Sequence, residues 1–468
     1  MQRRHAAGHE GCPVRHADRR GDIEILKARA VLGDAVDARC AYDLVAVAAK
    51  MIGAVLVGDD EEKIRRLIGF HRAVVQGLKN YLSHRHSLTP QGLACVPHCA
   101  MKGKMTNDFI EYWAAARLLL NHGNAYSPTE LLQLQRSVGW TQAMPLLMWN
   151  PPWTLALILP FGLLNHDTAQ SLWFLLHSVI IFLGAQLLWR LYGATPSPSR
   201  VGWLALLTFA PIYFVLLLGQ IAPLILAGLI GFLLTLRKRA WFWSGACLAV
   251  ASIKPHLLYL VWLSALLWIW RERKWQIAGG FLAGFAIMAG VPLLFDGQVY
   301  ARYITLMSDR TVVQPLDWAT PTIGTAVNAL FGSNSLWLRW LAAFGGMLWL
   351  LRYWRKNATQ WNWSVDLPLI LLASVATAPF SWTFDYVILL PALMQGSVWL
   401  GAVVKPQRVR GFSSIYLALC SSLLFGKILV RNDFWYFWLA PAFLILYIWL
   451  REDGKAMGTQ PNTVAQQL

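Results

Sequence analysis

The chain has 468 residues, of which 56% are hydrophobic and 14% are charged, and it carries 25 Trp. Soluble globular domains have about 25% charged residues, so this composition excludes an ordinary water-soluble enzyme. The formal net charge of +17 does not indicate a nucleic-acid partner, because the basic residues stand in short clusters between long apolar runs. Six Cys in a chain of this length predict no disulfide framework. The composition therefore predicts an all-α polytopic membrane protein.

Residues 1–104 differ in composition from the rest of the chain. They hold 17 Lys and Arg, 11 Asp and Glu, four of the six Cys and seven of the eleven His, whereas all 25 Trp lie at Trp113 or later. They contain no apolar run of the 18 or more residues that a spanning helix needs, and no secretory signal. We interpret 1–104 as a polar extension outside the ancestral domain, with Met101 and Met105 as plausible true starts.

Metal-ligating side chains gather at the end of this extension. Cys95 and Cys99 flank a Val-Pro-His sequence, and His84 and His86 stand nearby. The spacing fits no common zinc pattern and lacks a second Cys pair. We therefore expect no metal site and no cofactor.

Apolar segments follow one another beyond residue 145 and predict membrane-spanning helices. The expected spans are 168–189, 201–218, 221–236, 241–253, 257–270, 276–295, 335–351, 366–380, 386–404, 411–428 and 434–450. The fourth and fifth are short, and Lys254-Pro255 lies between them; Pro bends the chain there. Basic clusters flank both ends of this pair. The pair is therefore predicted to be a hairpin with both ends on one side of the membrane.

The distribution of basic residues between alternate loops predicts the orientation. One set of loops holds 16 basic residues: Arg190, Arg200, Arg237, Lys238, Arg239, Arg271, Arg273, Lys274, Arg352, Arg355, Lys356, Lys405, Arg408, Arg410, Arg451 and Lys455. The other set holds five: Lys254, Arg302, Arg310, Lys427 and Arg431. The positive-inside rule places the larger set, and with it the C-terminus, in the cytoplasm.

This orientation divides the rest of the chain into three parts. Residues 105–166 are expected to be a large first extracytoplasmic loop, 167–451 the multi-span domain, and 452–468 a cytoplasmic tail. An extracytoplasmic Asp108 requires one more span upstream, so the bundle is expected to hold about 11 or 12 helices. Polar residues at the ends of different helices then meet at one membrane face, where ionisable groups mark catalytic sites or pathways.

Asp108 begins a segment in which Phe109, Tyr112, Trp113, Ala116 and Leu120 repeat at helical spacing. We interpret it as an amphipathic helix in the membrane interface with its aromatic rings at the headgroups. Asp108 followed by Glu111 resembles a capping box, which makes a helix N-cap one interpretation of Asp108. A general base that takes a hydroxyl proton is the other, and the two are compatible.

Other candidate residues fall at the same face. Lys254 in an apolar hairpin needs a partner anion, for which a phosphate is suited, and Asp385 is an alternative partner. The paired prolines after Asn150 predict a re-entrant or interfacial helix, and the 296–320 loop, without clear periodicity, suggests a cover over a ligand. The expected substrate-binding residues are Lys254, His256, Gln220, Asp385, Trp382, Arg302, Arg310, Tyr112 and Asn150.

Five segments together resemble the family-87 glycosyltransferases of the GT-C superfamily in order and spacing. They are NDFIEYWAAARLLLNHGNAY (107–126), NPPWTLALILPFGLL (150–164), LLLGQIAPLIL (216–226), SIKPHLL (252–258) and APFSWTFDYVILLP (378–391). The resemblance covers about residues 105–450 and implies a GT-C-type bundle that uses a polyprenyl-phosphate-linked sugar, usually mannose. It implies that Asp108 is the catalytic base and that Lys254 and 382–385 line the donor pocket. The chain departs from the family at Asn150, where Tyr is usual, at Asp385, where some members have His, and in lacking a clear spanning helix before Asp108.

The sequence thus predicts a hexosyltransferase of the bacterial inner membrane that acts at the extracytoplasmic face. Its expected partners are membrane lipids, a lipid-linked sugar donor and a glycan or glycolipid acceptor; the oligomeric state is not predicted. The alternatives are a transporter or flippase of lipid-linked sugars, which many spans and an intramembrane Lys also suit, or an inactive homologue without the first helix. Against a transporter, the two halves of the chain show no internal repeat.

Overall fold

The computed structural model describes residues 107–193, 198–331, 335–402, 406–430 and 432–456. Within these ranges the chain forms α-helices and short 3₁₀ helices and no strand, which confirms the all-α prediction. The expected polar extension (1–104), its Cys and His cluster and the additional span expected before Asp108 lie outside the described residues. The helices and contacts given below all lie within these ranges.

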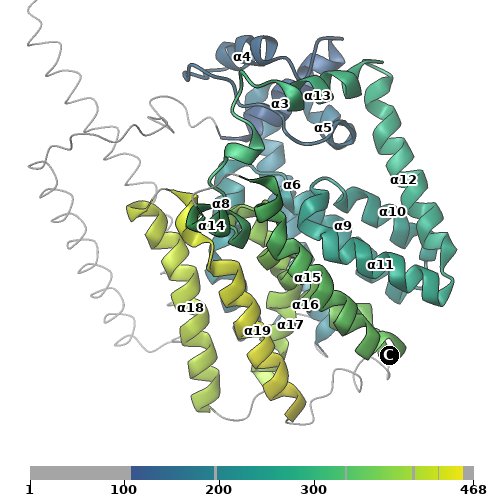
Figure 1. The fold of residues 1–468 in the computed structure, drawn as a ribbon, viewed down its shortest axis with the longest axis vertical. Helices are drawn as coiled ribbons and strands as arrows, with labels where there is room; N and C mark the ends of the chain where they lie inside the picture. Colours follow the sequence, from purple (N-terminus) through teal and green to yellow (C-terminus); the bar gives the residue numbers. More distant parts are fainter. Residues whose placement is uncertain (1–106, 194–197, 332–334, 403–405, 431, 457–468) are drawn as a thin grey trace, which may run out of the picture. The chain divides into compact units, whose positions relative to one another are not determined.

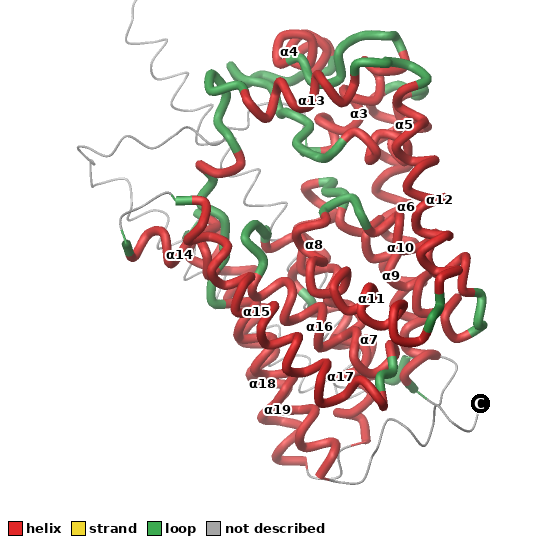
Figure 2. The backbone as a smooth tube through the Cα atoms, turned by 45° about the vertical axis from the view of Figure 1, so that its right-hand side comes forward, coloured by secondary structure: helices red, strands yellow, loops and turns green. Residues whose placement is uncertain are grey.

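Four short helices gather at one end of this part, which we name the α3 end (Figure 1). They are α3 (Phe109–Leu120), α4 (Pro128–Ser137), α5 (Leu155–Gly162), which follows the 3₁₀ helix η2 (Pro152–Thr154), and α13 (Val299–Ser308). Figure 2 shows α6 and α12 running from this end into the bundle. The short helix expected after the paired prolines is therefore present as η2 and α5.

The bundle contains the remaining helices. They are α6 (His166–Tyr192), α7 (Arg200–Thr208), α8 (Ala210–Leu218), α9 (Ala222–Arg237), α10 (Trp241–Ala251), α11 (Tyr259–Glu272), α12 (Trp275–Leu293), α14 (Ile323–Leu330), α15 (Leu336–Asn357), α16 (Trp363–Thr377), α17 (Leu390–Ala402), α18 (Pro406–Leu429) and α19 (Leu439–Ala456). The 3₁₀ helices η3 (Pro255–Leu258), η4 (Pro315–Asp317), η5 (Ala358–Gln360), η6 (Thr383–Leu389) and η7 (Asp433–Tyr436) connect them.

Within the described residues, each of the eleven segments predicted to span the membrane coincides for most of its length with α-helix or 3₁₀ helix. Five helical segments are long and apolar enough to cross a bilayer, and α7 with α8, bent by 49°, would make a sixth. Helices α9, α10 and α16 are apolar but shorter than a typical span. Length and composition thus confirm a multi-pass membrane protein, while the full number of 11 or 12 spans stays a prediction.

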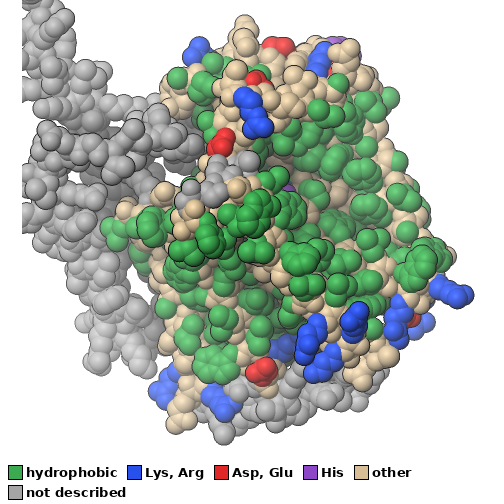
Figure 3. Space-filling view, viewed as in Figure 1, with side chains coloured by type: hydrophobic (Ala, Val, Ile, Leu, Met, Phe, Trp, Pro, Cys, Tyr) green, Lys and Arg blue, Asp and Glu red, His purple; other side chains and the backbone are tan. Residues whose placement is uncertain are grey.

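The outer surface of the bundle is that of a protein immersed in lipid. Large apolar side chains are exposed along α6, α12 and α15, among them Leu175 (56%), Leu282 (64%) and Trp337 (68%). A contiguous apolar surface of this kind marks contact with a membrane or a partner. In Figure 3 this surface is broad, and Lys and Arg side chains gather along the edge opposite the α3 end.

The predicted hairpin is present in α10 and α11. The ring of Trp241, at the start of α10, lies 6.2 Å from that of Trp268, near the end of α11. The Lys274 ammonium lies 4.5 Å from the Trp241 ring centroid, so both ends of the hairpin meet. Gly280 lets α10 and α12 pack closely, because a Cβ there would lie 1.8 Å from the Phe242 carbonyl oxygen.

Two predictions about the α3 end are wrong. Helix α3 does not present its aromatic rings to lipid headgroups: eight of its twelve residues are buried, including Tyr112 and Trp113, because α4, α5 and α6 pack around it. A helix that is apolar nearly all round belongs in a core. The 296–320 segment is not an irregular loop either, since α13 occupies 299–308.

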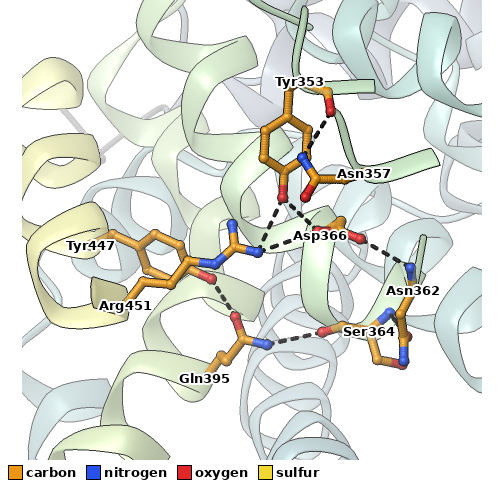
Figure 4. Close-up of polar contacts among 8 residues, drawn as sticks. All are labelled: Tyr353, Asn357, Asn362, Ser364, Asp366, Gln395, Tyr447 and Arg451. Carbon is orange, nitrogen blue, oxygen red and sulfur yellow. Dashed lines mark hydrogen bonds and ion pairs between the residues drawn. The ribbon is translucent and has the colours of Figure 1, made fainter. Parts of the chain in front are cut away.

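A buried polar network joins four helices at the end of the bundle opposite α3 (Figure 4). Arg451 Nη2 lies 3.3 Å from Asp366 Oδ1 and donates to the Tyr353 hydroxyl at 3.1 Å. The Tyr447 hydroxyl donates to Gln395, whose amide donates to the Ser364 carbonyl at 3.0 Å. Arg451, counted above among the basic loop residues, is therefore a buried ion-pair partner rather than a free charge at the membrane surface.

We predict that the α3 end is extracytoplasmic and the opposite end cytoplasmic. A membrane-impermeant maleimide should label Arg136→Cys and Val313→Cys from outside sealed cells, and Arg271→Cys and Arg355→Cys only in inverted vesicles, because these four positions are exposed. The background would be a chain without its native cysteines. Labelling of Val313→Cys and Arg355→Cys from the same side would contradict the predicted orientation.

Candidate active site

Asp108 occupies the N-cap position of α3, but its carboxylate makes no capping hydrogen bond. Instead, Asp108 Oδ2 accepts a hydrogen bond from Gln220 Nε2 at 2.7 Å. The backbone N–H of Asp108 donates to the Leu218 carbonyl at 2.8 Å, which fixes the start of α3 against the end of α8. The side chain is therefore directed at the α8–α9 junction rather than at its own helix.

Gln220 holds this carboxylate from a tight turn between α8 and α9. Gly219, just before it, has a positive φ of 66°, and a Cβ there would lie 2.9 Å from atoms of both Asn107 and Phe109. Only glycine suits this conformation and this close approach. Gln220 is 7% exposed, and its Oε1 accepts a hydrogen bond from the Tyr112 hydroxyl at 2.9 Å. Tyr112 thus orients the Gln220 amide so that its N–H groups face Asp108.

Glu111 is a second carboxyl group next to Asp108. Burial raises the pKa of Glu111 to about 8, and the negative charge of Asp108 contributes to this rise. Glu111 is therefore mainly protonated and neutral at pH 7. Sequence reasoning missed it, because its environment depends on the packing of α4, α5 and α6 around α3; the Asp-x-x-Glu spacing was the one available clue.

Lys254 and Asp385 form a buried ion pair across 131 residues of sequence. Lys254 Nζ lies 2.7 Å from Asp385 Oδ1, and the two side chains are 12% and 1% exposed. Asp385 Oδ2 accepts the backbone N–H of Trp382 at 2.9 Å, and the Phe384 ring centroid lies 5.2 Å from the ammonium. In the structure Asp385 therefore supplies the anion that a buried Lys254 requires.

The two clusters lie close enough to act on each other. The 3₁₀ helix η6, which carries Asp385, packs against α8 and α9 on either side of Gln220. The positive charge of Lys254 opposes the rise in the pKa of Glu111, and the charge of Asp385 helps to raise that of Tyr112. Asp108, Gln220, Tyr112, Lys254 and Asp385 thus form one polar site.

His256 borders this site as a neutral side chain. Burial, assisted by the charge of Lys254, lowers the pKa of His256 to about 4. Its ring lies 6.2 Å from that of Phe380 in an edge-on arrangement. At pH 7 it therefore offers an uncharged hydrogen-bonding ring rather than a second cation.

Four half-buried aromatic side chains form a row that leads to Lys254. Successive ring centroids of Trp149, Trp318, Trp382 and Phe384 are 5.7, 5.9 and 6.0 Å apart. Asn150, next to Trp149, is 7% exposed, and its carbonyl accepts the Tyr126 hydroxyl at 3.2 Å. The structure thus connects the Asn150 segment to Trp382 through Trp318, a residue that the sequence analysis did not select.

No contact within the described residues joins Arg302 or Arg310 to the Lys254–Asp385 pair. Arg302 Nη1 lies 3.0 Å from Asp296 Oδ2, on the segment that leads into α13. Arg310 is exposed. The same described ranges contain no group of three or more His, Cys, Asp or Glu side chains placed to hold a metal ion.

Residues 149–379 match the model of glycosyltransferase family 87. By this match the chain is a glycosyltransferase. The matched range contains Asn150, Gln220 and Lys254, whereas Asp108 and Asp385 lie outside it. No curated protein and no solved structure matches the chain. Together with the apolar helices, the match describes a multi-pass membrane glycosyltransferase.

The Lys254–Asp385 pair predicts a specific pattern of stability. Lys254→Met leaves Asp385 buried and unpaired, which costs about 3–5 kcal/mol, whereas removal of both charges in Lys254→Met/Asp385→Asn costs much less. The melting temperature of the purified protein should therefore fall further in the single variant than in the double variant.

Arg271→Met is the matched control, because Arg271 and its partner Glu272 are 43% and 44% exposed. Surface pairs contribute about 0–1 kcal/mol, so its melting temperature should stay close to that of the wild type. A double variant as unstable as Lys254→Met would show that the charge pair is not the source of the loss.

Proposed function

We propose that this enzyme transfers a hexose, mannose being the leading candidate, from a polyprenyl-phosphate-linked donor to a hydroxyl group of a lipid or glycan acceptor. The observation that carries the proposal is the Asp108 carboxylate, held by Gln220 beside the buried Lys254–Asp385 pair. In a displacement at an anomeric carbon, a carboxylate can take the proton of the acceptor hydroxyl and an ammonium can stabilise the charge that develops on the leaving phosphate. The resemblance of the segments around these residues to family 87 supports the same assignment.

Asp108 is the proposed general base. The acceptor hydroxyl oxygen attacks the anomeric carbon, its proton passes to the Asp108 carboxylate, and the bond between the anomeric carbon and the phosphate oxygen breaks. The electron pair of that bond leaves on the prenyl phosphate. Gln220, oriented by Tyr112, keeps the carboxylate in position through its 2.7 Å hydrogen bond, and such preorganisation lowers the cost of reaching the transition state.

Lys254 is proposed to face the phosphate of the donor. An ammonium has three N–H donors, and one of them is used by Asp385. The others suit a phosphate oxygen on which charge develops as the bond breaks. Asp385 fixes the Lys254 ammonium in place and balances its charge. The pair therefore contributes mainly by positioning the remaining N–H donors of Lys254 toward the phosphate.

The aromatic row is the proposed wall of the sugar and lipid path. Ligand sites are lined mainly by apolar and aromatic side chains with a few placed polar groups, and Trp149, Trp318, Trp382 and Phe384 fit that description beside Lys254. We place this site at the extracytoplasmic face of a bacterial inner membrane, with the C-terminus in the cytoplasm. The bias of 16 against five basic residues supports that orientation.

Asp108→Asn tests the assignment of the base. The variant keeps an acceptor for the Gln220 amide but cannot take a proton, so turnover with a prenyl-phosphate sugar should fall by about 10²- to 10⁴-fold. Its melting temperature should stay near that of the wild type. Turnover within about threefold of wild type would remove Asp108 from the role of base.

Glu111→Gln is the matched control, since it makes the same carboxyl-to-amide change three residues away. Because burial raises the pKa of Glu111 to about 8, the amide resembles the neutral form that predominates at pH 7, and most activity should remain. An inactive Glu111→Gln beside an active Asp108→Asn would assign the base to Glu111 instead.

A further inference from the structure

Arg339, in the first turns of α15, is a buried cation with unsatisfied hydrogen-bond donors. Its side chain is 2% exposed. Nη2 donates to the Trp318 carbonyl at 2.8 Å, but Nε and Nη1 have no hydrogen-bond partner. The guanidinium also lies 5.1 Å from the centroid of the Phe380 ring. A guanidinium has five N–H donors, so most of its hydrogen-bonding capacity is unused.

A buried charge in this condition is costly for the fold. Buried cations are normally paired with a carboxylate or fully hydrogen-bonded, as Arg451 is paired with Asp366 at the other end of the bundle. In the described ranges no ion pair joins Arg339 to a carboxylate. Asp317, the acidic residue whose charge acts on it, is exposed and accepts the backbone N–H of Gln314. Among the described residues, Arg339 is therefore a buried cation that no carboxylate pairs with directly.

Two contacts connect Arg339 to the candidate active site. The Phe380 ring beneath the guanidinium also contacts His256, two residues from Lys254. Trp318, whose carbonyl accepts from Nη2, has its ring 5.9 Å from that of Trp382 in the aromatic row, at a tilt of 54°. Ser381, between Phe380 and Trp382, is 1% exposed and its hydroxyl has no hydrogen-bond partner either. A second unsatisfied donor thus lies beside the same segment.

We propose that Arg339 binds the phosphate monoester of the prenyl-phosphate carrier and holds it as the leaving group. This inference rests on the proposed function and adds to it the residue that supplies the uncompensated positive charge. Lys254 has its charge balanced by Asp385 at 2.7 Å, whereas Arg339 has an unpaired charge and free donors suited to bidentate contact with phosphate oxygens. Both unpaired nitrogens are covered, so neighbouring groups must move aside for the phosphate to reach them.

The test compares prenyl phosphate with the matching prenol. The full chain in phosphatidylcholine nanodiscs would be titrated with farnesyl phosphate and with farnesol. The dissociation constant for farnesol divided by that for farnesyl phosphate measures recognition of the phosphate, and a high ratio means strong recognition. The variants are Arg339→Met, Arg339→Lys and, as a control, Arg136→Met, which removes an exposed Arg from α4. Charge-assisted hydrogen bonds contribute about 1.5–3 kcal/mol, so Arg339→Met should lower the ratio by about tenfold to a hundredfold.

Further readouts separate ligand binding from a structural role. Removal of an unpaired buried charge should leave the melting temperature of ligand-free Arg339→Met no lower than that of the wild type, whereas a structural arginine would lower it. Arg339→Lys keeps the charge without the bidentate fork and should give an intermediate ratio. Arg136→Met should behave as the wild type. A wild-type ratio in Arg339→Met, or an equal loss of farnesol binding, would overturn the proposal.

Two further arms identify the source of the phosphate. Inorganic phosphate, or phosphatidylglycerol added to the nanodiscs, should not displace farnesyl phosphate at equal concentration; displacement would show a general anion site and would overturn the assignment to the carrier. A wild type that prefers farnesyl phosphate through Arg339 but transfers no sugar would support this subsite and contradict the proposed transferase chemistry. A wild type without that preference would overturn both.

Discussion

The buried pair of Lys254 and Asp385 is the interaction on which the arrangement of the site depends. A lysine in an apolar hairpin needs an anion nearby, and the one that the fold supplies comes from 131 residues further along the chain. This requirement fixes η6 against the α10–α11 turn, while η6 also packs on α8 and α9. The α8–α9 junction in turn presents Gln220 to Asp108. A single electrostatic constraint thus connects three segments of the bundle with the start of α3.

The two buried arginines of the bundle, Arg451 and Arg339, differ in whether a carboxylate of the described residues pairs with them. At the end opposite α3, Arg451 is paired with Asp366 and donates to Tyr353, and the three residues join α15, α16 and α19, although Arg451 Nε has no hydrogen-bond partner. At the end facing α3, Arg339 keeps two nitrogens without partners, and Glu111 is mainly neutral beside Asp108. A carboxylate that compensates a buried cation, as Asp366 does for Arg451, lets the cation serve the fold alone. Unsatisfied or perturbed groups in a polar site are typical of places where a ligand completes the interactions.

The sequence predicted the helices well because apolar runs between basic clusters identify spans without any knowledge of tertiary contacts. The hairpin at Lys254 was predicted in the same way, from the basic clusters that flank both of its ends. Helix α3 was misjudged, because five spaced apolar residues resemble a surface stripe, whereas the alanines and isoleucine between them are buried as well. Arg339 was missed since it lies inside an apolar run counted as a span. The pairing of Gln220 with Asp108, 112 residues apart, leaves no local pattern that sequence reasoning can detect.

The claim that the donor is a prenyl-phosphate-linked sugar is tested most directly by following both products of one reaction. Purified enzyme would be given an acceptor with radiolabelled prenyl-phosphate mannose or, in parallel, nucleotide-linked mannose. The proposed mechanism predicts one prenyl phosphate released for each mannose joined to the acceptor, and no transfer from the nucleotide sugar. Transfer from the nucleotide sugar, or movement of intact prenyl-phosphate mannose across a vesicle membrane without release of prenyl phosphate, would contradict it.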